Sequence, residues 1–563
     1  MPEARESLIA TRGAQMFPRL TDEEIARLSR FGEPRGYPKG AFVARAGEVA
    51  PGLLLILSGQ LEIREHDGAG HGSTIVVHER GNFAGELAQL SGRPSLVDAV
   101  ALTNVETVVI PPDRLRALLI AEAALGEQIM RALILRRVGL IETGSGPIIV
   151  GPEGDAGVLR LVNFLRRNGY PYQQLDPATD SCARTLVEQF EVVPEELPIV
   201  LCPNGNLLRK PSEDQLARCV GLVGPVDPHK LYDVVVVGAG PSGLATAVYA
   251  GSEGLSVLVI DCRSFGGQAG ASARIENYLG FPTGISGMAL MGRAFSQAQK
   301  FGVEILVPEE CVKLECGNDP CHVLLATGER VKARSVVLAT GARYRRLDVD
   351  RLDEFEGSSV HYWASPLEAD LCAEQDVVLV GGGNSAGQAT VFLAGRARKV
   401  TLVARRPLEQ TMSSYLVERI RALPNVDVVI GCEIAELEGS DGELRGVTIR
   451  ERDTGKLIRK AARYLFSFIG AEPNTDWVQS SGIRLDRQGF VLTGEEVGAG
   501  YPLETSRGGV FAIGDVRSGS VKRVASSVGD GAQVVAAIHK YLAATAEAQP
   551  VQTAMQPQPA AAE

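Results

Sequence analysis

The residues most able to do chemistry follow the apolar run 233–237, which leads into a glycine-rich turn at 238–243 and then an alanine-rich stretch. A strand, turn and helix of this kind bind a dinucleotide: the first glycine tightens the turn, the second lets the backbone approach the pyrophosphate, and the third lets the helix pack on the strand. The next apolar run, 257–260, ends in an acid that can accept from a ribose hydroxyl. The predicted site residues are Gly238, Gly240, Pro241, Ser242, Gly243 and Asp261.

A second strand and glycine turn stand at 377–386. The strand that follows, 399–403, leads to Arg405 and Arg406 instead of an acid. An acid would repel the 2′-phosphate of NADPH, whereas arginines pair with it. We therefore predict FAD at the first turn and NADPH at the second, although Arg405 and Arg406 could form only a solvated surface pair. The predicted NADPH contacts are Gly381, Gly383, Asn384, Ser385, Ala386, Arg405 and Arg406.

Two further segments, at 339–342 and 509–516, resemble flavoprotein fingerprints, and those at 266–268, 275–278, 522–525 and 529–532 resemble low-molecular-weight thioredoxin reductases. The resemblance covers 231–545 and implies two nested Rossmann-like α/β domains: an FAD-binding domain at 231–345 and 471–545, and an NAD(P)H-binding domain at 346–470. It also implies a homodimer. The FAD contacts that it adds are Gly266, Gly267, Gln268, Asn277, Thr340, Gly341, Gly514, Asp515, Arg523, Val524 and Ala525.

The chain departs from this family at 363–366, where thioredoxin reductases carry the Cys-x-x-Cys that passes electrons from flavin to thioredoxin. Here the residues are Trp363, Ala364, Ser365 and Pro366. A dithiol relay needs a thiolate, so the usual route of disulfide reduction is closed. Ferredoxin-NADP reductases on the same scaffold also lack the dithiol. We assign no catalytic side chain, expect Trp363 near the flavin, and leave the acceptor open among ferredoxin, flavodoxin, a quinone and oxygen.

Two alternatives to this NADPH oxidoreductase stay open. One is a thioredoxin-disulfide reductase that uses a non-standard cysteine. The other is a flavin-based redox sensor whose output is conformational. A sensor would be reduced once by NADPH and would then turn over poorly.

Residues 1–143 contain short apolar runs broken by Gly40, Gly47 and Gly59, followed by a long helical pattern over 112–141. The region resembles cyclic nucleotide-binding domains, which implies a regulatory β-roll, and 83–88 is similar to their phosphate-binding cassette. The family's phosphate-binding arginine falls on Ser95, so we expect no conventional cyclic-AMP receptor; Arg93 either replaces that arginine or lies in a surface turn. The ligand residues implied for a cyclic nucleotide or related ligand are Gly85, Glu86, Leu87, Arg93 and Ser95.

Residues 146–224 predict the order strand, helix, strand, helix, strand, strand, helix, with Pro198 opening an apolar strand. The region resembles glutaredoxin and thioredoxin domains, in which that proline is cis. The Cys-x-x-Cys of those domains falls on residues 155–158, which contain no cysteine. The resemblance therefore implies a thioredoxin-like α/β domain without dithiol chemistry.

Composition limits the remaining possibilities. The 563 residues include 45% hydrophobic and 22% charged residues and carry a net charge of −11, which is unfavourable for nucleic-acid binding. The first residues show no signal-peptide pattern, so we expect a cytoplasmic protein that does not enter a membrane. The nine cysteines form no Cys-x-x-Cys pair, and neither a disulfide scaffold nor a metal site is expected. Residues 546–563 are rich in alanine, glutamine and proline and predict a disordered tail.

Overall fold

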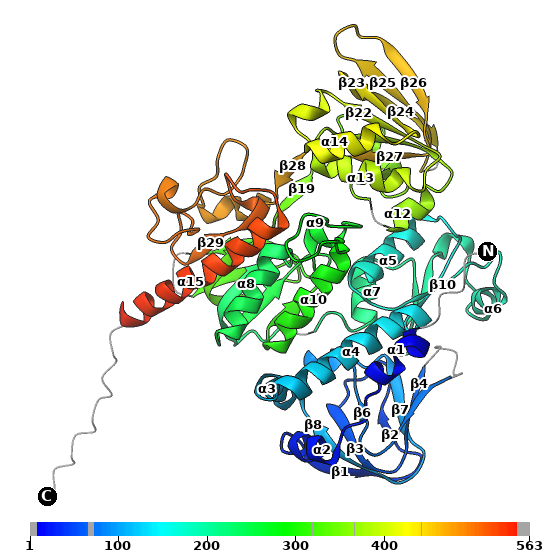
Figure 1. Ribbon diagram of the computed structural model, residues 1–563, viewed down its shortest axis with the longest axis vertical. Coiled ribbons are helices and arrows are strands. Elements are labelled where there is room, and N and C mark those ends of the chain that lie inside the picture. The colour runs from blue at the N-terminus through cyan, green and yellow to red at the C-terminus, as the bar shows by residue number, and fades with distance from the viewer. Residues whose placement is uncertain are drawn as a thin grey trace, which may run out of the picture.

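The computed structural model describes residues 8–65, 73–224, 226–316, 320–364, 366–440 and 442–548. It contains an N-terminal β-roll, a middle α/β unit and two dinucleotide-type α/β domains, which are arranged as Figure 1 shows. Within these ranges, no helix is both long and apolar enough to span a bilayer. Most of the predicted tail lies outside the described residues, but its first residues, 546–548, continue the last helix.

Two antiparallel sheets form the β-roll. One has the order β1 (Glu33–Tyr37), β8 (Val105–Ile110), β3 (Leu53–Ser58) and β6 (Phe83–Ala84), and the other has the order β2 (Phe42–Ala44), β7 (Val97–Ala101), β4 (Leu61–Glu65) and β5 (Thr74–His78). Helices α1 (Leu8–Met16) and α2 (Asp22–Ser29) precede them. Gly59 has a φ of +84°, and a Cβ there would lie 2.3 Å from the Asn104 carbonyl oxygen, so this turn requires glycine.

The predicted single helix over 112–141 is two helices, α3 (Pro112–Ala121) and α4 (Ala123–Thr143). They meet at Glu122, which has φ −113° and ψ 80°, and whose carboxylate pairs with Arg27 of α2. A Cβ on Gly126 would lie 2.8 Å from the Leu119 carbonyl oxygen. The bend therefore lets both helices bury their leucines in the same core as the β-roll.

The middle unit has a four-stranded sheet in the order β10 (Gln173–Leu175), β9 (Ile148–Val150), β11 (Ile199–Leu201), β12 (Leu207–Arg209). Strands β9 and β10 are parallel, while β11 is antiparallel to both of its neighbours. Helices α5 (Ala156–Arg167), α6 (Ser181–Gln189) and α7 (Glu213–Cys219) complete the unit. The elements follow the order predicted from the sequence, and the Leu197–Pro198 peptide bond is cis.

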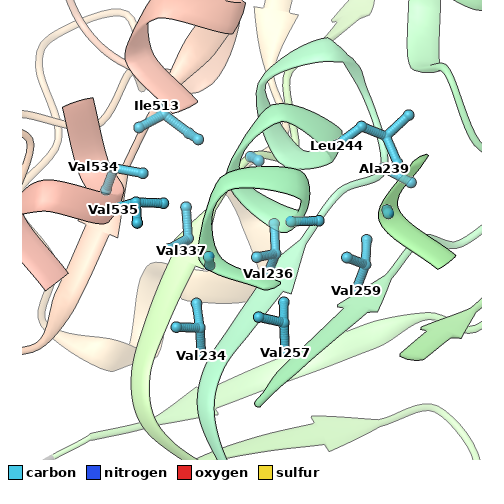
Figure 2. Close-up of a cluster of buried hydrophobic side chains, with 14 of the residues drawn as sticks. Val234, Val236, Ala239, Leu244, Val257, Val259, Val337, Ile513, Val534 and Val535 are labelled. Atoms are coloured by element: carbon cyan, nitrogen blue, oxygen red, sulfur yellow. The ribbon is translucent and has the colours of Figure 1, made fainter. Parts of the chain in front are cut away.

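The first dinucleotide-type domain has the strand order β15 (Glu304–Leu306), β14 (Val257–Ile260), β13 (Leu231–Val237), β18 (Arg330–Leu338), β17 (Cys321–Leu325), β16 (Cys311–Glu315), with β29 (Val510–Ala512) also pairing with β18. Its helices are α8 (Pro241–Ser252), α9 (Gly267–Gly270), α10 (Gly287–Lys300) and α15 (Val524–Ala548). Figure 2 shows valines of β13, β14 and β18 packed beneath α8 and against Val534 and Val535 of α15. This core fixes the glycine turn that leaves the end of β13.

The second dinucleotide-type domain is inserted through a two-stranded link of β19 (Ala342–Tyr344) and β28 (Ala471–Pro473). Its parallel sheet has the order β20 (Val360–His361), β27 (Tyr464–Ser467), β21 (Asp376–Val380), β22 (Lys399–Ala404), β23 (Val426–Ile430). Antiparallel strands β24 (Cys432–Ser440), β25 (Glu443–Glu451) and β26 (Leu457–Ala461) form a separate sheet. The helices are α11 (Leu352–Phe355), α12 (Pro366–Leu371), α13 (Asn384–Ala394) and α14 (Ser414–Arg421).

The cysteines differ from the sequence prediction. Cys202 at the end of β11 pairs with Cys219 at the end of α7, and Cys316 pairs with Cys321 across the β16–β17 hairpin. The sequence implies no disulfide scaffold, yet the structure contains these two disulfides, because the fold brings together cysteines whose spacing along the chain has no recognisable pattern. Among the described residues, no group of acidic, histidine or cysteine side chains could hold a metal ion.

Candidate functional site

The glycine turn after β13 has the geometry that a pyrophosphate requires. Gly238 has a φ of +111°, and a Cβ there would lie 2.2 Å from the Ala339 carbonyl oxygen. A Cβ on Gly243 would lie 1.9 Å from the Gly238 carbonyl oxygen, so close packing of α8 on the strand excludes a side chain. At Gly240, by contrast, a Cβ would meet nothing within 4 Å. The backbone at Gly240 is therefore open to a ligand at the N-terminus of α8.

Asp261 stands beside this turn, directly after β14. Its Oδ2 accepts from the Ala239 N–H at 2.8 Å, and its Oδ1 accepts from the N–H groups of Arg263 and Ser264 at 3.0 and 3.1 Å. Burial raises the pKa of Asp261, and these backbone donors partly oppose the rise. The carboxylate is thus held in place next to the predicted pyrophosphate position, where a ribose hydroxyl can reach it.

Two segments distant in sequence converge on the same turn. Gly267, with a φ of +53°, would place a Cβ 3.1 Å from the Cα of Gly240. Gly514, with a φ of +67°, would place one 2.6 Å from the Ser242 Oγ. Burial also raises the pKa of Asp515, while Lys522 opposes this shift. The fold therefore brings the predicted FAD segments 266–268 and 514–515 together around Gly240.

Other predicted FAD residues lie at the margins. The Gln268 side chain donates to the Ala342 carbonyl oxygen, and the Thr340 hydroxyl donates to the Asn474 carbonyl oxygen at 2.9 Å. Gly341 has a φ of +64° and precedes the β19–β28 link. Arg523 and Ala525 are exposed near Val524, the first residue of α15, and Asn277 is exposed in a separate loop.

The second glycine turn, after β21, repeats the first. A Cβ on Gly381 would lie 2.6 Å from the Phe468 carbonyl oxygen, whereas one on Gly383 would meet nothing within 4 Å. Ala386 is fully buried in α13, and Asn384 at the start of that helix accepts from the Ser413 N–H at 2.7 Å. Ser385 lines the cavity between the two domains.

Arg405 and Arg406 directly follow β22 and are exposed. Neither forms an ion pair within the described part of the chain. An unpaired guanidinium beside an open glycine turn can bind a phosphate group without first breaking an ion pair.

A cavity of about 270 Å³ lies between the two dinucleotide-type domains. Gln268 and Glu276 line it from the first domain, and Trp363, Ser385 and Gln388 line it from the second. Arg419 of α14 pairs with Glu276 across the cleft at 3.5 Å. The space is bounded by the segments predicted to bind both dinucleotides, and no cysteine of the described chain lines it.

Trp363, which the sequence predicts at the family's dithiol position, contacts three side chains. Its Nε1 donates to Glu368 Oε1 at 2.9 Å, and the guanidinium carbons of Arg167 and Arg263 lie 5.7 and 5.9 Å from its ring centre. Arg167 belongs to α5 of the middle unit and also donates to the Gly267 carbonyl oxygen at 2.9 Å. Arg167 and Arg263 belong to no motif, so sequence reasoning did not identify them.

The free thiols near these domains are poorly suited to carry electrons. Cys372, the nearest cysteine to Trp363 along the chain, is fully buried, and burial raises the pKa of its thiol to about 12. Burial likewise raises the pKa of the Cys311 thiol. A thiol with such a pKa carries almost no thiolate at neutral pH.

In the β-roll, the predicted ligand residues separate into two groups. Gly85, Glu86 and Ser95 line a cavity of about 230 Å³ inside the roll. Leu87 and Arg93 line a different cavity, of about 350 Å³, at the junction with the middle unit and the first dinucleotide-type domain. The guanidinium of Arg93 lies 5.8 Å from the ring centre of Phe295 in α10. Leu87 and Arg93 therefore line the junction cavity and not the cavity inside the roll, and their contacts with a ligand stay predictions.

Comparison with known proteins agrees with this geometry. Residues 232–531 match the family described as pyridine nucleotide-disulphide oxidoreductase, and residues 34–122 match the cyclic nucleotide-binding domain. The thioredoxin reductase of Mycolicibacterium smegmatis is 32% identical over 314 residues, covering 56% of this chain and 97% of that protein. The NADPH-dependent thioredoxin reductase 3 of Arabidopsis thaliana is 33% identical over 317 residues, covering 55% of this chain and 58% of that protein.

Among solved structures, thioredoxin reductase of Lactococcus lactis superposes with a TM-score of 0.52 at 27% identity, covering 56% of this chain and 99% of that one. The chain belongs to the pyridine nucleotide-disulphide oxidoreductase family and carries a thioredoxin reductase-like pair of Rossmann-type domains. Its N-terminal part is a cyclic nucleotide-binding domain.

Proposed function

We propose that this protein is an FAD-dependent NADPH oxidoreductase that delivers electrons without a dithiol at the family's usual position. The observation that carries the proposal is the cavity between the two dinucleotide-type domains, which Trp363 lines and which no cysteine of the described residues reaches. The candidate acceptors are ferredoxin, flavodoxin, a quinone and oxygen, all of which take electrons without a thiol intermediate.

The residues around the first turn fit FAD. The open backbone at Gly240 would hold the pyrophosphate, Asp261 the ribose, and Asp515 the ribityl chain. When bound, FAD would supply the capacity to take a hydride and pass on electrons. The chain's own contribution is positional: Gly383, Arg405 and Arg406 would bind NADPH, and the walls of the cavity would limit the access of water.

One observation favours a second candidate, a thioredoxin-disulfide reductase with a non-standard cysteine pair. The middle unit contains the Cys202–Cys219 disulfide. Its strand order supports a thioredoxin-like fold for 146–224. However, the described residues around the cavity include no sulfur, and Asp155 caps α5 where the glutaredoxin dithiol would begin. We therefore infer a redox-silent adaptor.

We assign regulation to the N-terminal domain, acting through the side of the roll that meets the other units. Arg137 of α4 donates to Glu86 at 2.9 and 2.7 Å and also lines the junction cavity that contains Arg93 and Phe295. A ligand that moves Glu86 would therefore also move Arg137, which lies at the junction with the first dinucleotide-type domain. We also propose that the protein is a homodimer, because it resembles thioredoxin reductases. We propose a cytoplasmic location because the first residues show no signal-peptide pattern.

The test is steady-state NADPH consumption with ferricyanide, compared with a Gly383→Val variant. A Cβ at Gly383 would meet nothing within 4 Å, so the Gly383→Val variant should fold. The valine side chain would nevertheless block the approach of a pyrophosphate. We expect repeated turnover by the unchanged protein, and loss of turnover with retained flavin in the variant. A single reduction without further turnover would support the redox sensor instead.

A further inference from the structure

The cavity inside the β-roll has mostly apolar walls. It measures about 230 Å³ and lies between the two sheets and α4. Its apolar lining includes Met16, Leu54, Ile63, Val97 and Leu140. A ligand that fills this space must therefore present an apolar body to most of the surface, because each polar atom placed against these walls would lose its hydrogen bonds to water.

Four buried polar atoms on side chains that line the cavity nevertheless have no hydrogen-bond partner among the described residues. They are Glu86 Oε1, Gln89 Oε1, Arg136 Nη2 and His78 Nδ1, and all four side chains line the cavity. Buried polar groups in proteins are normally paired, so a cluster of unpaired ones marks the position of a missing partner. A ligand with matching groups would satisfy them.

Arg136 is the most informative of the four. It is only 7% exposed, and its Nε and Nη1 donate to the carbonyl oxygens of Met16 and Gly85, each at 2.8 Å. The rings of Phe83 and Phe17 flank it at 4.6 and 5.3 Å. It forms no ion pair with any described carboxylate, and burial lowers its pKa to about 9. A buried cation without a counter-ion favours binding of an anion.

Glu86 does not supply that counter-ion. Arg137 donates twice to its Oε2, at 2.9 and 2.7 Å, so its charge is already balanced and its Oε1 is left as an acceptor. Gln89 Oε1 is a further free acceptor. The ligand therefore needs an anionic group that pairs with Arg136. It also needs an O–H or N–H group that donates to Glu86 or Gln89.

A cyclic nucleotide matches this arrangement poorly. Ser95 occupies the place of the family's phosphate-binding arginine, and its hydroxyl donates to the Val97 carbonyl oxygen at 2.7 Å. Arg93 lies outside the cavity. The many ring nitrogens and sugar oxygens of a nucleotide would also face apolar walls without partners.

We propose that the β-roll binds a small amphipathic carboxylate, with Arg136 pairing with the carboxylate and Glu86 accepting from a hydroxyl or N–H group carried by the ligand's apolar body. The carboxylate would form charge-assisted hydrogen bonds with Arg136 Nη2. This ligand would occupy the signal-receiving site of the N-terminal domain, but its binding does not depend on the redox activity proposed above.

Calorimetry on the full-length protein tests the assignment with 3-(4-hydroxyphenyl)propanoate as the probe. Its amide lacks the anion, 3-phenylpropanoate lacks the donor, and cyclic AMP represents the family ligand. We expect the acid to bind at least about tenfold more tightly than its amide, since charge-assisted hydrogen bonds are roughly twice as strong as neutral ones. We expect 3-phenylpropanoate to bind more weakly than the probe, and cyclic AMP to bind more weakly than both acids.

The variant Arg136→Met should remove the preference for acid over amide. Its matched control is Arg131→Met, a residue of the same helix that pairs with Glu127 at the surface and should leave binding unchanged. Equal binding of acid and amide, or tighter binding of cyclic AMP than of the acid, would overturn the proposal. The comparison of acid with amide uses the unchanged protein. It therefore tests the preference for an anionic ligand even if Arg136→Met does not fold.

Discussion

The guanidinium of Arg167, the last residue of α5, donates to the carbonyl oxygen of Gly267 at 2.9 Å. These residues belong to the middle unit and to the short helix α9 beside the first glycine turn, which Figure 1 shows as neighbouring parts of the molecule. The same guanidinium lies over Trp363 of the inserted domain. One side chain therefore links the middle unit to both dinucleotide-type domains, which gives the middle unit a structural role that requires no sulfur.

Replacement of Arg167 by methionine should weaken the binding of FAD. The substitution keeps the length of the side chain but removes the donor to Gly267, and a hydrogen bond contributes about 0.5–1.5 kcal/mol, or more when charged. We expect the dissociation constant of FAD, measured by the recovery of flavin fluorescence, to rise by roughly threefold to tenfold. Arg166→Met is the matched control because that side chain is exposed. Equal increases in the dissociation constant for the two variants would show that the hydrogen bond to Gly267 does not contribute to FAD binding.

Arg405 and Arg406 should determine the choice of nucleotide. Each charge-assisted contact to the 2′-phosphate contributes about 1.5–3 kcal/mol, so the double alanine variant should bind NADPH at least about a hundredfold more weakly. Binding of NADH, which lacks that phosphate, should change little. Arg398→Ala serves as the control, since Arg398 precedes β22 at the opposite end of the strand and pairs with Asp376. Equal losses for NADPH and NADH would refute the assignment.

The Cys202–Cys219 disulfide should stabilise the middle unit. It closes a loop with a sequence separation of 17 residues, and crosslinks of this kind contribute about 2–4 kcal/mol to the free energy of unfolding. Urea titrations of the double alanine variant should show a loss of that size without reductant, and a reductant should remove most of the difference. Cys182→Ala, at an exposed free cysteine, should have no such effect. An unchanged midpoint would indicate that the pair is reduced in the folded protein.

His78 should make the N-terminal domain sensitive to acid. Burial, assisted by the positive charge of Arg136, lowers its pKa to about 3, from about 6.5 in an unfolded chain. Between these values the unfolded state binds the extra proton, so stability is lost as the pH falls through the unfolded pKa. Between pH 7.5 and 5 the loss is about 2 kcal/mol. Over the same pH range, the unfolding free energy of His78→Gln should fall by about 2 kcal/mol less than that of the unchanged protein. His229→Gln, at an exposed site, should lose as much stability as the unchanged protein does.

The parts of the site that could be predicted are those that a local pattern determines. The two glycine turns and the acid after β14 lie in strand, turn and helix units whose spacing is fixed along the chain. The strand and helix order of the middle unit could be predicted for the same reason. In both cases the relevant contacts join residues close in sequence or in successive elements.

The missed features depend on contacts between distant segments. No local pattern indicates that Arg136 turns into the β-roll while its neighbour Arg137 pairs with Glu86. The bend at Glu122 results from packing of two helices on one core, whereas the sequence alone has a continuous helical pattern. The position of Arg93 along the chain leaves open whether it replaces the family's arginine, and its contact with Phe295 at the junction involves a segment about 200 residues away.

The central claim is that electrons leave the flavin without passing through a cysteine pair. The most direct test measures NADPH-dependent reduction of ferricyanide and of thioredoxin by the unchanged protein and by a variant with Cys182, Cys202, Cys219, Cys311, Cys316, Cys321 and Cys372 replaced by serine. We predict ferricyanide turnover by both proteins and thioredoxin turnover by neither. Thioredoxin reduction by the unchanged protein that disappears in the variant would contradict the account and would identify a cysteine relay.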